Sequence, residues 1–184
     1  DEPAVRRLCD GGDTRGCAAL GVLLHRRGRD AEAEAPARDG CDAGEPTACV
    51  CLGIVVYALG RGAEAEAPWR KACDAGDPIG CRNLGVLLHG HARATDAEAP
   101  ARFACEAGDA PGCSTLGAVL ASLGDDPGAE TALRRGCEGG DAAGCRNLAT
   151  LLGDLGRPDE SRLARQRACE LGQFDDCPAG GGIR

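Results

Sequence analysis

Apolar residues recur along this chain every 32 residues and, within each period, at helical spacing. When positions are counted from the first cysteine of each repeat, position 12 is leucine in five copies, and positions 15 and 16 are apolar in the same copies. The leucines are Leu20, Leu52, Leu84, Leu116 and Leu148. A spacing of three to four places such residues on one side of an amphipathic helix. The pattern therefore predicts a first helix in each repeat with one buried stripe.

Two series of cysteines mark the same period without slipping by a residue. The first series is Cys9, Cys41, Cys73, Cys105, Cys137 and Cys169, and the second is Cys17, Cys49, Cys81, Cys113, Cys145 and Cys177. A fixed period indicates one repeat array rather than ordinary domains. We assign residues 1–177 to this array: a half repeat (1–8), hairpin repeats that begin at Cys9, Cys41, Cys73, Cys105 and Cys137, and a partial repeat (169–177). Residues 178–184 are predicted to be a flexible tail.

Glycine and acidic residues predict where the helices end and begin. Position 4 is glycine in all six copies, and position 5 is acidic in five, as in Gly44 and Glu45. Glycine suits the left-handed residue after a helix, and aspartate suits the N-cap of the next one. One helix should therefore end near position 3 and the next begin near position 6. Position 20 is glycine in four of five copies, Ala92 being the exception, which predicts the end of the first helix.

A second helix is predicted over about positions 23 to 35. Its signal is a Glu-to-Arg pair at i, i+4, which suits an exposed helical face. The pairs are Glu2–Arg6, Glu34–Arg38, Glu66–Arg70, Glu98–Arg102 and Glu130–Arg134. Pro36, Pro68 and Pro100 lie between the pair members. Because proline disrupts a helix interior, the helix either begins close before these prolines or bends there.

The composition implies a core of small side chains that needs covalent support. The chain of 184 residues has no methionine and four aromatic residues, of which Tyr57 and Trp69 lie in one repeat. Thirteen cysteines are typical of an oxidising compartment, extracellular or periplasmic. No apolar run is long enough to span a membrane, and a net charge of −8 argues against nucleic acid as a partner. Since no signal peptide precedes Asp1, we expect a processed or trimmed chain.

The repeated string A-C-[DE]-x-G-[DE]-x-x-G-C-x-x-L-G-x-L-L resembles the Sel1-like repeat family, which is related to the tetratricopeptide hairpin. Residues 72–88 and 137–152 carry the resemblance, which is closest to the cysteine-rich Hcp-type branch. The repeats here are a few residues shorter than is usual in the family. The resemblance implies an all-α fold, a right-handed αα-hairpin superhelix with one disulfide per C-x7-C pair. These pairs are Cys9–Cys17, Cys41–Cys49, Cys73–Cys81, Cys105–Cys113, Cys137–Cys145 and Cys169–Cys177.

The cysteine pairs fit disulfides better than zinc. Zinc ligands prefer C-x₂₋₄-C spacing and converge in groups of four, whereas these pairs recur one repeat apart without nearby histidines. Cys51 is left unpaired. It is interpreted as a buried or half-buried thiol, with an intermolecular bridge or a reactive thiol as the alternatives.

Variable positions on the first helix supply candidate binding residues, since related superhelices turn this helix toward their concave groove. Position 17 holds His25, Tyr57 and His89, and positions 10 and 11 hold Arg82 with Asn83 and Arg146 with Asn147. Ordinary solvated side chains are the alternative interpretation of this strip. His25 and His89 are two repeats apart and cannot share a metal ion.

Three functions are consistent with these features. The first is a non-enzymatic secreted or periplasmic scaffold that binds a protein or peptide through a concave first-helix face. The second is a structural subunit that stacks end to end on copies of itself into a filament. The third, penicillin binding or weak β-lactamase activity, is implied only by the resemblance. No serine begins an S-x-x-K motif, and the sequence has neither a histidine cluster nor a phosphate-binding loop. We therefore predict that the protein has no enzyme activity and binds no metal or cofactor.

Overall fold

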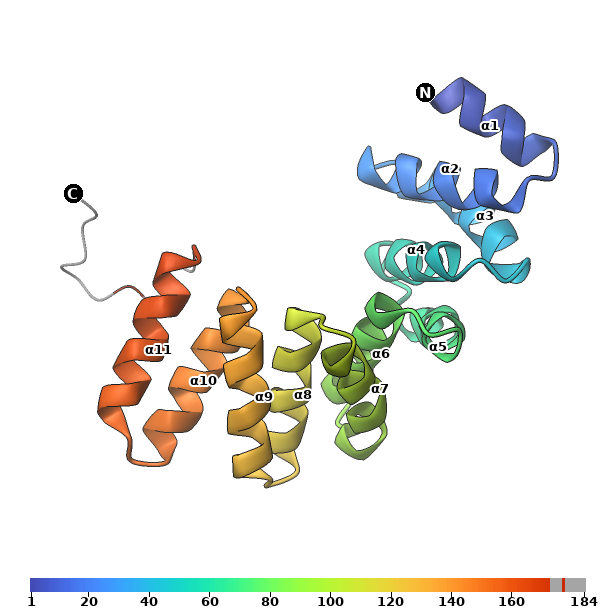
Figure 1. The fold of residues 1–184 in the computed structure, drawn as a ribbon. Helices are drawn as coiled ribbons and strands as arrows, with labels where there is room; N and C mark the ends of the chain where they lie inside the picture. The colour runs from blue at the N-terminus through green and yellow to red at the C-terminus, as the bar shows by residue number, and fades with distance from the viewer. Residues whose placement is uncertain (173–176, 178–184) are drawn as a thin grey trace, which may run out of the picture. The chain divides into compact units, whose positions relative to one another are not determined.

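A computed structural model describes residues 1–172 and 177, and the described chain is helical (Figure 1). Its elements are α1 (Glu2–Asp10), α2 (Thr14–Arg26), α3 (Asp30–Asp42), α4 (Pro46–Ala58), the 3₁₀ helix η1 (Gly62–Ala65), α5 (Glu66–Asp74), α6 (Pro78–Gly90), α7 (Ala94–Glu106), α8 (Ala110–Ser122), α9 (Asp126–Glu138), α10 (Ala142–Asp154) and α11 (Pro158–Glu170). They form two compact units, Asp1–Leu84 and Gly85–Arg184, and each is described by itself. Consecutive helices pack as antiparallel hairpins, and α8 to α11 lie side by side in chain order (Figure 1).

The helix boundaries repeat with the predicted period. The first helices (α2, α4, α6, α8 and α10) all begin at position 6, and the second helices α3, α7, α9 and α11 all begin at position 22. In the repeat that begins at Cys41, η1 occupies positions 22 to 25, so α5 begins two residues before Pro68. Pro36 and Pro100 are the seventh residues of α3 and α7, which continue through them. The predicted fold class, an all-α hairpin solenoid of 32-residue repeats joined by disulfides, is confirmed.

The predicted caps form in most repeats. Asp13, Asp77, Asp109 and Asp141 accept hydrogen bonds from backbone N–H groups in the first turn of the following helix. Glu45 makes no such bond, because its side chain is one methylene longer than aspartate, and it lies 3.6 Å from Arg15 Nε instead. The glycines at position 4 have φ from 83° to 98°, the left-handed conformation that the sequence predicted. Gln173, at position 5 of the last copy, lies outside the described residues.

Ala92 occupies the left-handed conformation that glycine adopts in the other repeats. Its φ is 58°, whereas Gly28, Gly60, Gly124 and Gly156 at the same position have φ from 70° to 80°. A left-handed residue with a Cβ costs roughly 1–2 kcal/mol. We expect Ala92→Gly to raise the free energy of unfolding by about 1 kcal/mol and the melting temperature by a few degrees.

Ala99→Gly is the matched control, because Ala99 is exposed inside α7. There the same substitution should lower stability by about 1 kcal/mol. Thermal melts followed by circular dichroism measure both effects. A shift of the same sign in the two variants would contradict a conformational cause.

Five disulfides join the end of a second helix to the first turn of the next first helix, and the sixth joins Cys169 near the end of α11 to Cys177. All six predicted pairs are bonded in the structure, and their Cα atoms lie 4.2 to 5.2 Å apart. The second cysteine of each of the first five pairs is buried. Each of these five bridges therefore closes a short turn directly against the core.

Glycine at position 13 allows the two helices of a hairpin to touch. A Cβ added at Gly21 or Gly85 would lie 3.0 or 3.2 Å from an alanine Cβ of the second helix. A Cβ at Gly53 would lie 2.3 Å from Nε1 of Trp69, the largest side chain of this core, which is 6% exposed. This confirms that these glycines serve close packing.

Ion pairs link consecutive second helices as well as residues within one helix. The five predicted i, i+4 pairs all form, at 2.7 to 3.1 Å. In addition, Arg61 donates to Glu34 of the preceding second helix at 2.8 Å and to Glu64 of its own repeat. The pKa of Glu34 is lowered, chiefly by the Arg61 hydrogen bond. Arg29 and Arg157 make the same double contact, with Glu2 and Glu32 and with Glu130 and Glu160.

The fourth repeat, which begins at Cys105, lacks the arginine that contacts two consecutive second helices. Asp125 stands where Arg29, Arg61 and Arg157 stand in their repeats, and it caps α9 by accepting from the Gly128 N–H at 3.1 Å. Because a single exposed ion pair contributes little to the free energy of unfolding, the absence of the bridging arginine in this repeat affects the local ion pairs more than the overall stability.

Candidate functional site

The first helices form one side of each unit. In Asp1–Leu84, α2 packs against α4, and in Gly85–Arg184, α8 packs against α10, whereas the second helices α9 and α11 touch only slightly. Positions 14, 17 and 18 of the first helices are exposed or partly exposed in every repeat, and positions 10 and 11 are so in some of the repeats. We call the surface that these accessible residues form the first-helix face. It is the surface on which the predicted binding residues lie.

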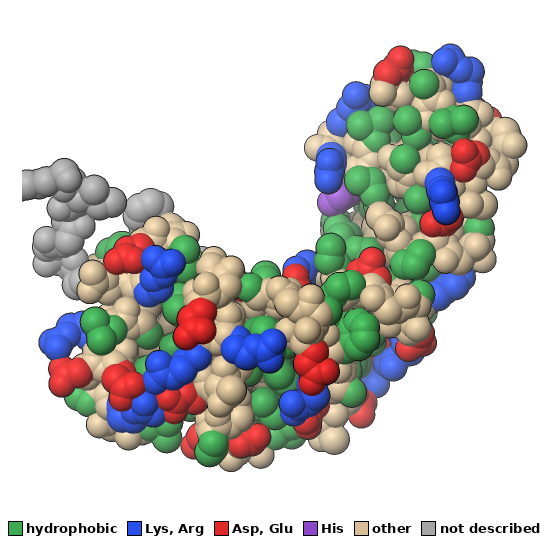
Figure 2. Space-filling model, in the orientation of Figure 1, with side chains coloured by type: hydrophobic (Ala, Val, Ile, Leu, Met, Phe, Trp, Pro, Cys, Tyr) green, Lys and Arg blue, Asp and Glu red, His purple; other side chains and the backbone are tan. Residues whose placement is uncertain are grey.

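The first-helix face differs in chemistry between the two units. In Asp1–Leu84 it is mostly apolar over α2 and α4: Ala19, Val22, Ile54, Tyr57 and Ala58. In Gly85–Arg184 it is mostly polar over α8 and α10: Thr115, Ser122, Arg146, Asn147, Thr150 and Asp154. Figure 2 shows hydrophobic side chains gathered over α1 and α2, and acidic and basic side chains alternating over α8 to α11.

The position-17 side chains lie over the start of their own second helix. His25 Nδ1 is 2.6 Å from Asp30 Oδ1 at the first residue of α3. Tyr57 is 57% exposed, its ring centroid is 5.9 Å from that of Trp69, and its ring would contact a Cβ added at Gly62. His25 is therefore engaged within the protein, while Tyr57 leaves much of its ring accessible.

His89 lies at the same position of α6 but does not have the partner that His25 has. Its Nδ1 is buried and has no hydrogen-bond partner among the described residues. Ala94 stands where the first repeat has Asp30, and it offers no acceptor. A buried polar atom without a partner destabilises the folded state.

Supplying the missing acceptor should therefore stabilise the protein. We expect Ala94→Asp to raise the free energy of unfolding by about 1 kcal/mol, since the new carboxylate can accept from His89. Thr95→Asp is the control, because it adds the same charge to the first turn of α7. Residue 95 does not have the spacing from His89 that Asp30 has from His25. Urea denaturation at neutral pH measures both. If both variants were stabilised equally, the cause would be the interaction of the new charge with the helix dipole alone and not a hydrogen bond from His89.

The other predicted binding residues divide between the units. Arg82 and Asn83 adjoin each other on α6, where Arg82 Nε lies 3.4 Å from Asn83 Oδ1. Arg146 and Asn147 lie at the matching positions of α10. Asp1–Leu84 therefore carries four of the seven predicted residues (His25, Tyr57, Arg82 and Asn83), and Gly85–Arg184 carries His89, Arg146 and Asn147. A binding role for all seven stays a prediction.

Cys51 is an unpaired thiol inside the core. It is 4% exposed, and burial, with a smaller effect of Asp30, raises its pKa to about 11. The thiolate is the reactive form, so this environment is that of an inert structural cysteine. The placement favours the interpretation as a buried thiol over a bridge or a reactive group.

Cys51 should react with thiol reagents only after unfolding. We expect iodoacetamide at pH 8 to modify it at least about a hundredfold more slowly in the native oxidised chain than in 6 M guanidinium, because both access and ionisation are suppressed. Ala19→Cys in a Cys51→Ala background is the matched control, since Ala19 is exposed at the same position of α2. Mass spectrometry follows the reaction. Fast native labelling of Cys51 would contradict the buried placement.

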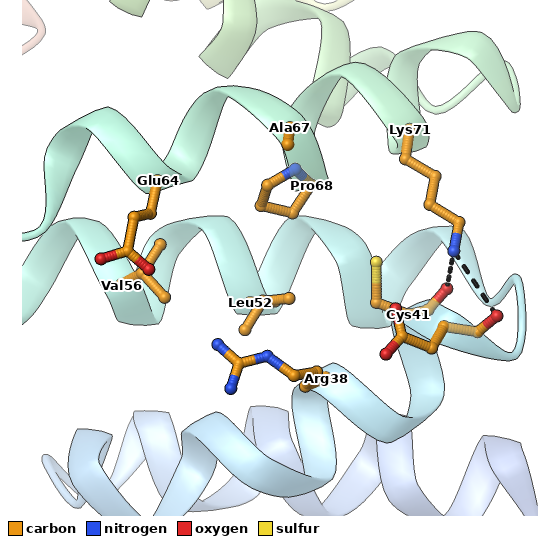
Figure 3. A pocket seen from close by; sticks show the side chains of 9 residues that line it. Arg38, Cys41, Leu52, Val56, Glu64, Ala67, Pro68 and Lys71 are labelled. Carbon is orange, nitrogen blue, oxygen red and sulfur yellow. Dashed lines mark hydrogen bonds between the residues drawn. The ribbon is translucent and has the colours of Figure 1, made fainter.

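Hollows on the described surface of Asp1–Leu84 include two that bear on the site. The first, which we call the outer groove, has a volume of about 330 Å³ between α3, α4 and α5, with Leu52, Val56 and Pro68 in its lining (Figure 3). Figure 3 shows Lys71 reaching across it to the carbonyl oxygens of Cys41, at 2.6 Å, and Asp42. Two further charged side chains of the groove also have partners, since Arg38 pairs with Glu34 and Glu64 pairs with Arg61.

The outer groove is a product of hairpin stacking. A hollow of about 190 Å³ occurs in the last hairpin at equivalent positions, including Arg134, Cys137, Leu148, Leu152 and Glu160. Because the same arrangement recurs with its charges paired, the outer groove is not a specialised site.

The second hollow, which we call the α2 trough, lies on the first-helix face and has a volume of about 490 Å³. Its lining comes from α1, α2 and the start of α4, and includes Val5, Ala19, Val22, Leu23 and Arg26. It was not predicted from the sequence. One feature of the sequence could have indicated it. Positions 10, 11, 14 and 15 are all apolar or small in α2, whereas most later repeats have a polar residue in at least one of these positions.

The described residues contain no group of three or more His, Cys, Asp or Glu side chains arranged to hold a metal ion. Over the same part of the chain, no helix combines the length and apolar character needed to cross a bilayer.

This geometry defines the class of the protein: stacked αα-hairpins of the tetratricopeptide type. The family described as tetratricopeptide repeat matches residues 142–162. The fold is, more particularly, that of Sel1-like repeat proteins. A Sel1 repeat protein from Oxalobacter formigenes superposes with a TM-score of 0.74 at 21% identity, over 95% of this chain and 79% of that one.

Two further solved structures show the same fold. A protective antigen of uropathogenic Escherichia coli with an SLR fold gives a TM-score of 0.72 at 24% identity, over 94% of this chain and 41% of that one. YrrB, a TPR protein with an unusual peptide-binding site, gives 0.68 at 19% identity, over 91% of each chain. Comparison with curated protein sequences found no match. The likeness to the cysteine-rich branch rests on the sequence resemblance alone.

Proposed function

We propose that this protein is a non-enzymatic scaffold that binds a protein or peptide through its first-helix face. The observation that carries the proposal is the contrast between constant and variable positions of the first helices. Position 12 is leucine and buried in every complete repeat, whereas the face positions change from repeat to repeat and include exposed side chains such as Tyr57 and Val86, 57% and 53% accessible. Contiguous exposed apolar patches, rather than single exposed residues, are typical of interaction surfaces.

Fold-level likeness supports the same function. Tetratricopeptide-type repeats are interaction scaffolds, and YrrB, which shares the fold, has an unusual peptide-binding site. The disulfides indicate an oxidising environment, and we propose an extracellular or periplasmic location.

The two alternative functions have less support. For end-to-end stacking, no contact among the described residues speaks in its favour. Penicillin binding or weak β-lactamase activity rests on the family resemblance, and no serine of the sequence is followed by the lysine of an S-x-x-K motif.

The proposal is tested by selecting peptides that bind the protein and then substituting residues on the first-helix face and, as a control, on the opposite surface. Peptides selected on the immobilised, oxidised chain from a random library should bind at least about tenfold more weakly to a Tyr57→Arg or Arg146→Glu variant, according to the unit that they occupy. Ala99→Arg, on an exposed site of α7, is the control and should have no effect. Failure to select any peptide, or loss of binding only in the Ala99 variant, would contradict the proposal. A nitrocefin assay and sedimentation velocity test the two alternatives.

A further inference from the structure

We propose that the second-helix side of the unit Gly85–Arg184 binds a helical segment of another protein that carries arginine and glutamate three residues apart. The binding surface consists of Glu98 and Arg102 of α7 and the groove between α7, α8 and α9. It is separate from the first-helix face, so the inference goes beyond the proposed function and does not depend on it. Three features support it: half of an ion-pair ring that is complete in the next hairpin, an accessible glutamate, and a groove whose charges complement such a segment.

An ion-pair ring joins α9 to the start of α11. The N–O distances from Arg134 are 2.7 Å to Glu130 of its own helix and 2.9 Å to Glu160 of α11. Arg157, the N-cap residue of α11, closes the ring at 2.6 Å from Glu130 and 2.7 Å from Glu160. Hydrogen bonds from Arg157 and Arg134 lower the pKa of Glu160 to about 2. Each charge of the ring therefore has two oppositely charged neighbours, and the α11 half is an arginine and a glutamate three residues apart.

Only half of such a ring is present between α7 and α9. Glu98 and Arg102 hold positions 26 and 30, as the α9 members of the ring do, and their N–O distance is 2.8 Å. The other half would come from positions 21 and 24 of the next repeat, which hold Asp125 and Gly128. Asp125 has the wrong charge to pair with Glu98, and it caps α9 instead. Among the residues that the structure describes, Glu98 and Arg102 pair with each other and with no side chain of α9.

The missing half leaves Glu98 accessible next to a groove. Its side chain is 37% exposed, whereas that of Glu130 in the complete ring is 20% exposed. A groove of about 350 Å³ lies between α7, α8 and α9, and Arg102 lines it. The equivalent hollows of the second and the last hairpin have a glutamate of position 24 in their lining, where this groove has Gly128. A glutamate of the partner can therefore supply the carboxylate that α9 does not provide to Arg102.

The charges around the groove favour a segment that carries both signs. Arg102, Arg135 and Asp125 line the groove, and Glu98 adjoins Arg102. The Arg135 guanidinium also donates to the Cys105 carbonyl at 3.1 Å. An arginine of the partner is expected between Glu98 and Asp125, with its glutamate beside Arg102. A purely acidic segment would be repelled by the two carboxylates, and a purely basic one by the two guanidinium groups.

The partner segment is expected to be the first turn of a helix. Residues three apart lie on the same side of a helix, and Arg157 and Glu160 have this spacing where α11 begins. Leu116 and Leu120 of α8 also line the groove. The aliphatic stems of a partner's arginine and glutamate can pack on these leucines while the charged ends reach the rim.

A different protein is a better fit for the groove than a second copy of this chain. Three arginine–glutamate pairs with the required spacing occur at the start of second helices, and each already contacts the preceding second helix through its arginine. These pairs are Arg29–Glu32, Arg61–Glu64 and Arg157–Glu160. Because they are engaged within their own molecule, they are not free to bind the groove of another.

The test is a selection against a variant in which the ring is complete. Asp125→Arg combined with Gly128→Glu supplies the missing half from the chain itself, and we call this double change the filled variant. A displayed library of alanine-based helical peptides of about 20 residues, randomised on one face, is depleted on the filled variant and then selected on the oxidised wild-type chain. We expect the enriched peptides to share an arginine and an acidic residue three positions later. Circular dichroism checks that the filled variant is folded.

Single substitutions measure the contribution of Glu98. A fluorescein-labelled enriched peptide should bind Glu98→Gln at least about fivefold more weakly, because the arginine of the peptide loses its carboxylate. Glu34→Gln is the matched control, since Glu34 holds the same position in α3 and already pairs with Arg38 and Arg61. It should leave peptide affinity within about twofold of the wild type. Changing the arginine of the peptide to glutamate should weaken binding to the wild type and partly restore binding to Glu98→Arg.

The outcomes separate this inference from the proposed function. Failure to recover any peptide that distinguishes the wild type from the filled variant would overturn the inference. So would enriched peptides without the expected pair of residues, or equal losses of affinity in Glu98→Gln and Glu34→Gln. The scaffold function would remain, because peptides on the first-helix face respond to Tyr57→Arg or Arg146→Glu and not to the filled variant. A dimer in sedimentation equilibrium that the filled variant abolishes would assign the groove to a second copy and would also overturn the inference.

Discussion

Reduction of the six disulfides is expected to unfold this protein at temperatures at which the oxidised chain is fully helical. Each bridge closes a loop of about nine residues, which in the chain-entropy model stabilises the fold by roughly 2.5 kcal/mol. A domain of this size has a net stability of about 5–15 kcal/mol, so losing all six contributions exceeds what the fold can tolerate. The core offers limited compensation, because many of the buried side chains beside the leucines are alanine and cysteine, which bury little apolar area each.

Circular dichroism at 222 nm with and without a phosphine reductant measures the effect. The double variant Cys105→Ala and Cys113→Ala removes one bridge and should lower the free energy of unfolding by about 2–3 kcal/mol. Cys51→Ala is the control for reagent effects, since it retains all six bridges and should unfold on reduction as the wild type does. A reduced chain that melts within a few degrees of the oxidised one would show that hairpin packing alone maintains the fold.

Gly53→Ala is expected to destabilise the protein more than any other glycine-to-alanine change inside a first helix. The added Cβ would lie 2.3 Å from Trp69 Nε1 and 2.5 Å from its Cδ1. Trp69 cannot move freely, since it is buried and its Nε1 donates to the Val50 carbonyl at 3.3 Å. Overpacking of this kind costs about 1–3 kcal/mol, and loss of the indole hydrogen bond adds about 1 kcal/mol.

A double-mutant cycle identifies the cause. Trp69→Ala alone should cost about 3–5 kcal/mol through the cavity that it leaves. The double variant should be more stable than the sum of the single changes predicts, because removal of the indole also removes its clash with the Cβ added at residue 53. Gly90→Ala is the control: a Cβ there meets nothing within 4 Å, so stability should fall by little or rise. Additive effects in the cycle would contradict a direct clash.

Local sequence signals predicted most of the fold. Gly44 and its equivalents predicted left-handed helix ends, and Asp13, Asp77, Asp109 and Asp141 predicted N-caps, because both effects act within three or four residues. The prolines were less informative. Pro36 and Pro100 each remove only one backbone N–H donor from the helix. Whether the helix continues past them depends on how the preceding turn packs, and the sequence could not decide this.

The candidate site was only partly predictable. The first-helix register correctly placed Tyr57 on an accessible surface, but it gave no sign that His25 bonds to Asp30 or that His89 Nδ1 has no partner among the described residues. The α2 trough was not recognised, because solvent exposure at Val5 and Leu23 depends on which neighbouring helix covers them. Likewise, the contacts from Arg61 to Glu34 join residues 27 apart in the sequence.

The sequence by itself therefore determined the repeat length, the boundaries of the first helices and the ion pairs within single helices, since each depends on spacing along the chain, and its family resemblance implied the cysteine pairing. The tertiary structure alone decided which arginines bridge consecutive second helices, which glycines touch the opposite helix, and where an apolar surface remains uncovered. These features depend on the stacking of one hairpin on the next, and stacking is set by side-chain volume and burial across the repeat interface rather than by neighbours in sequence.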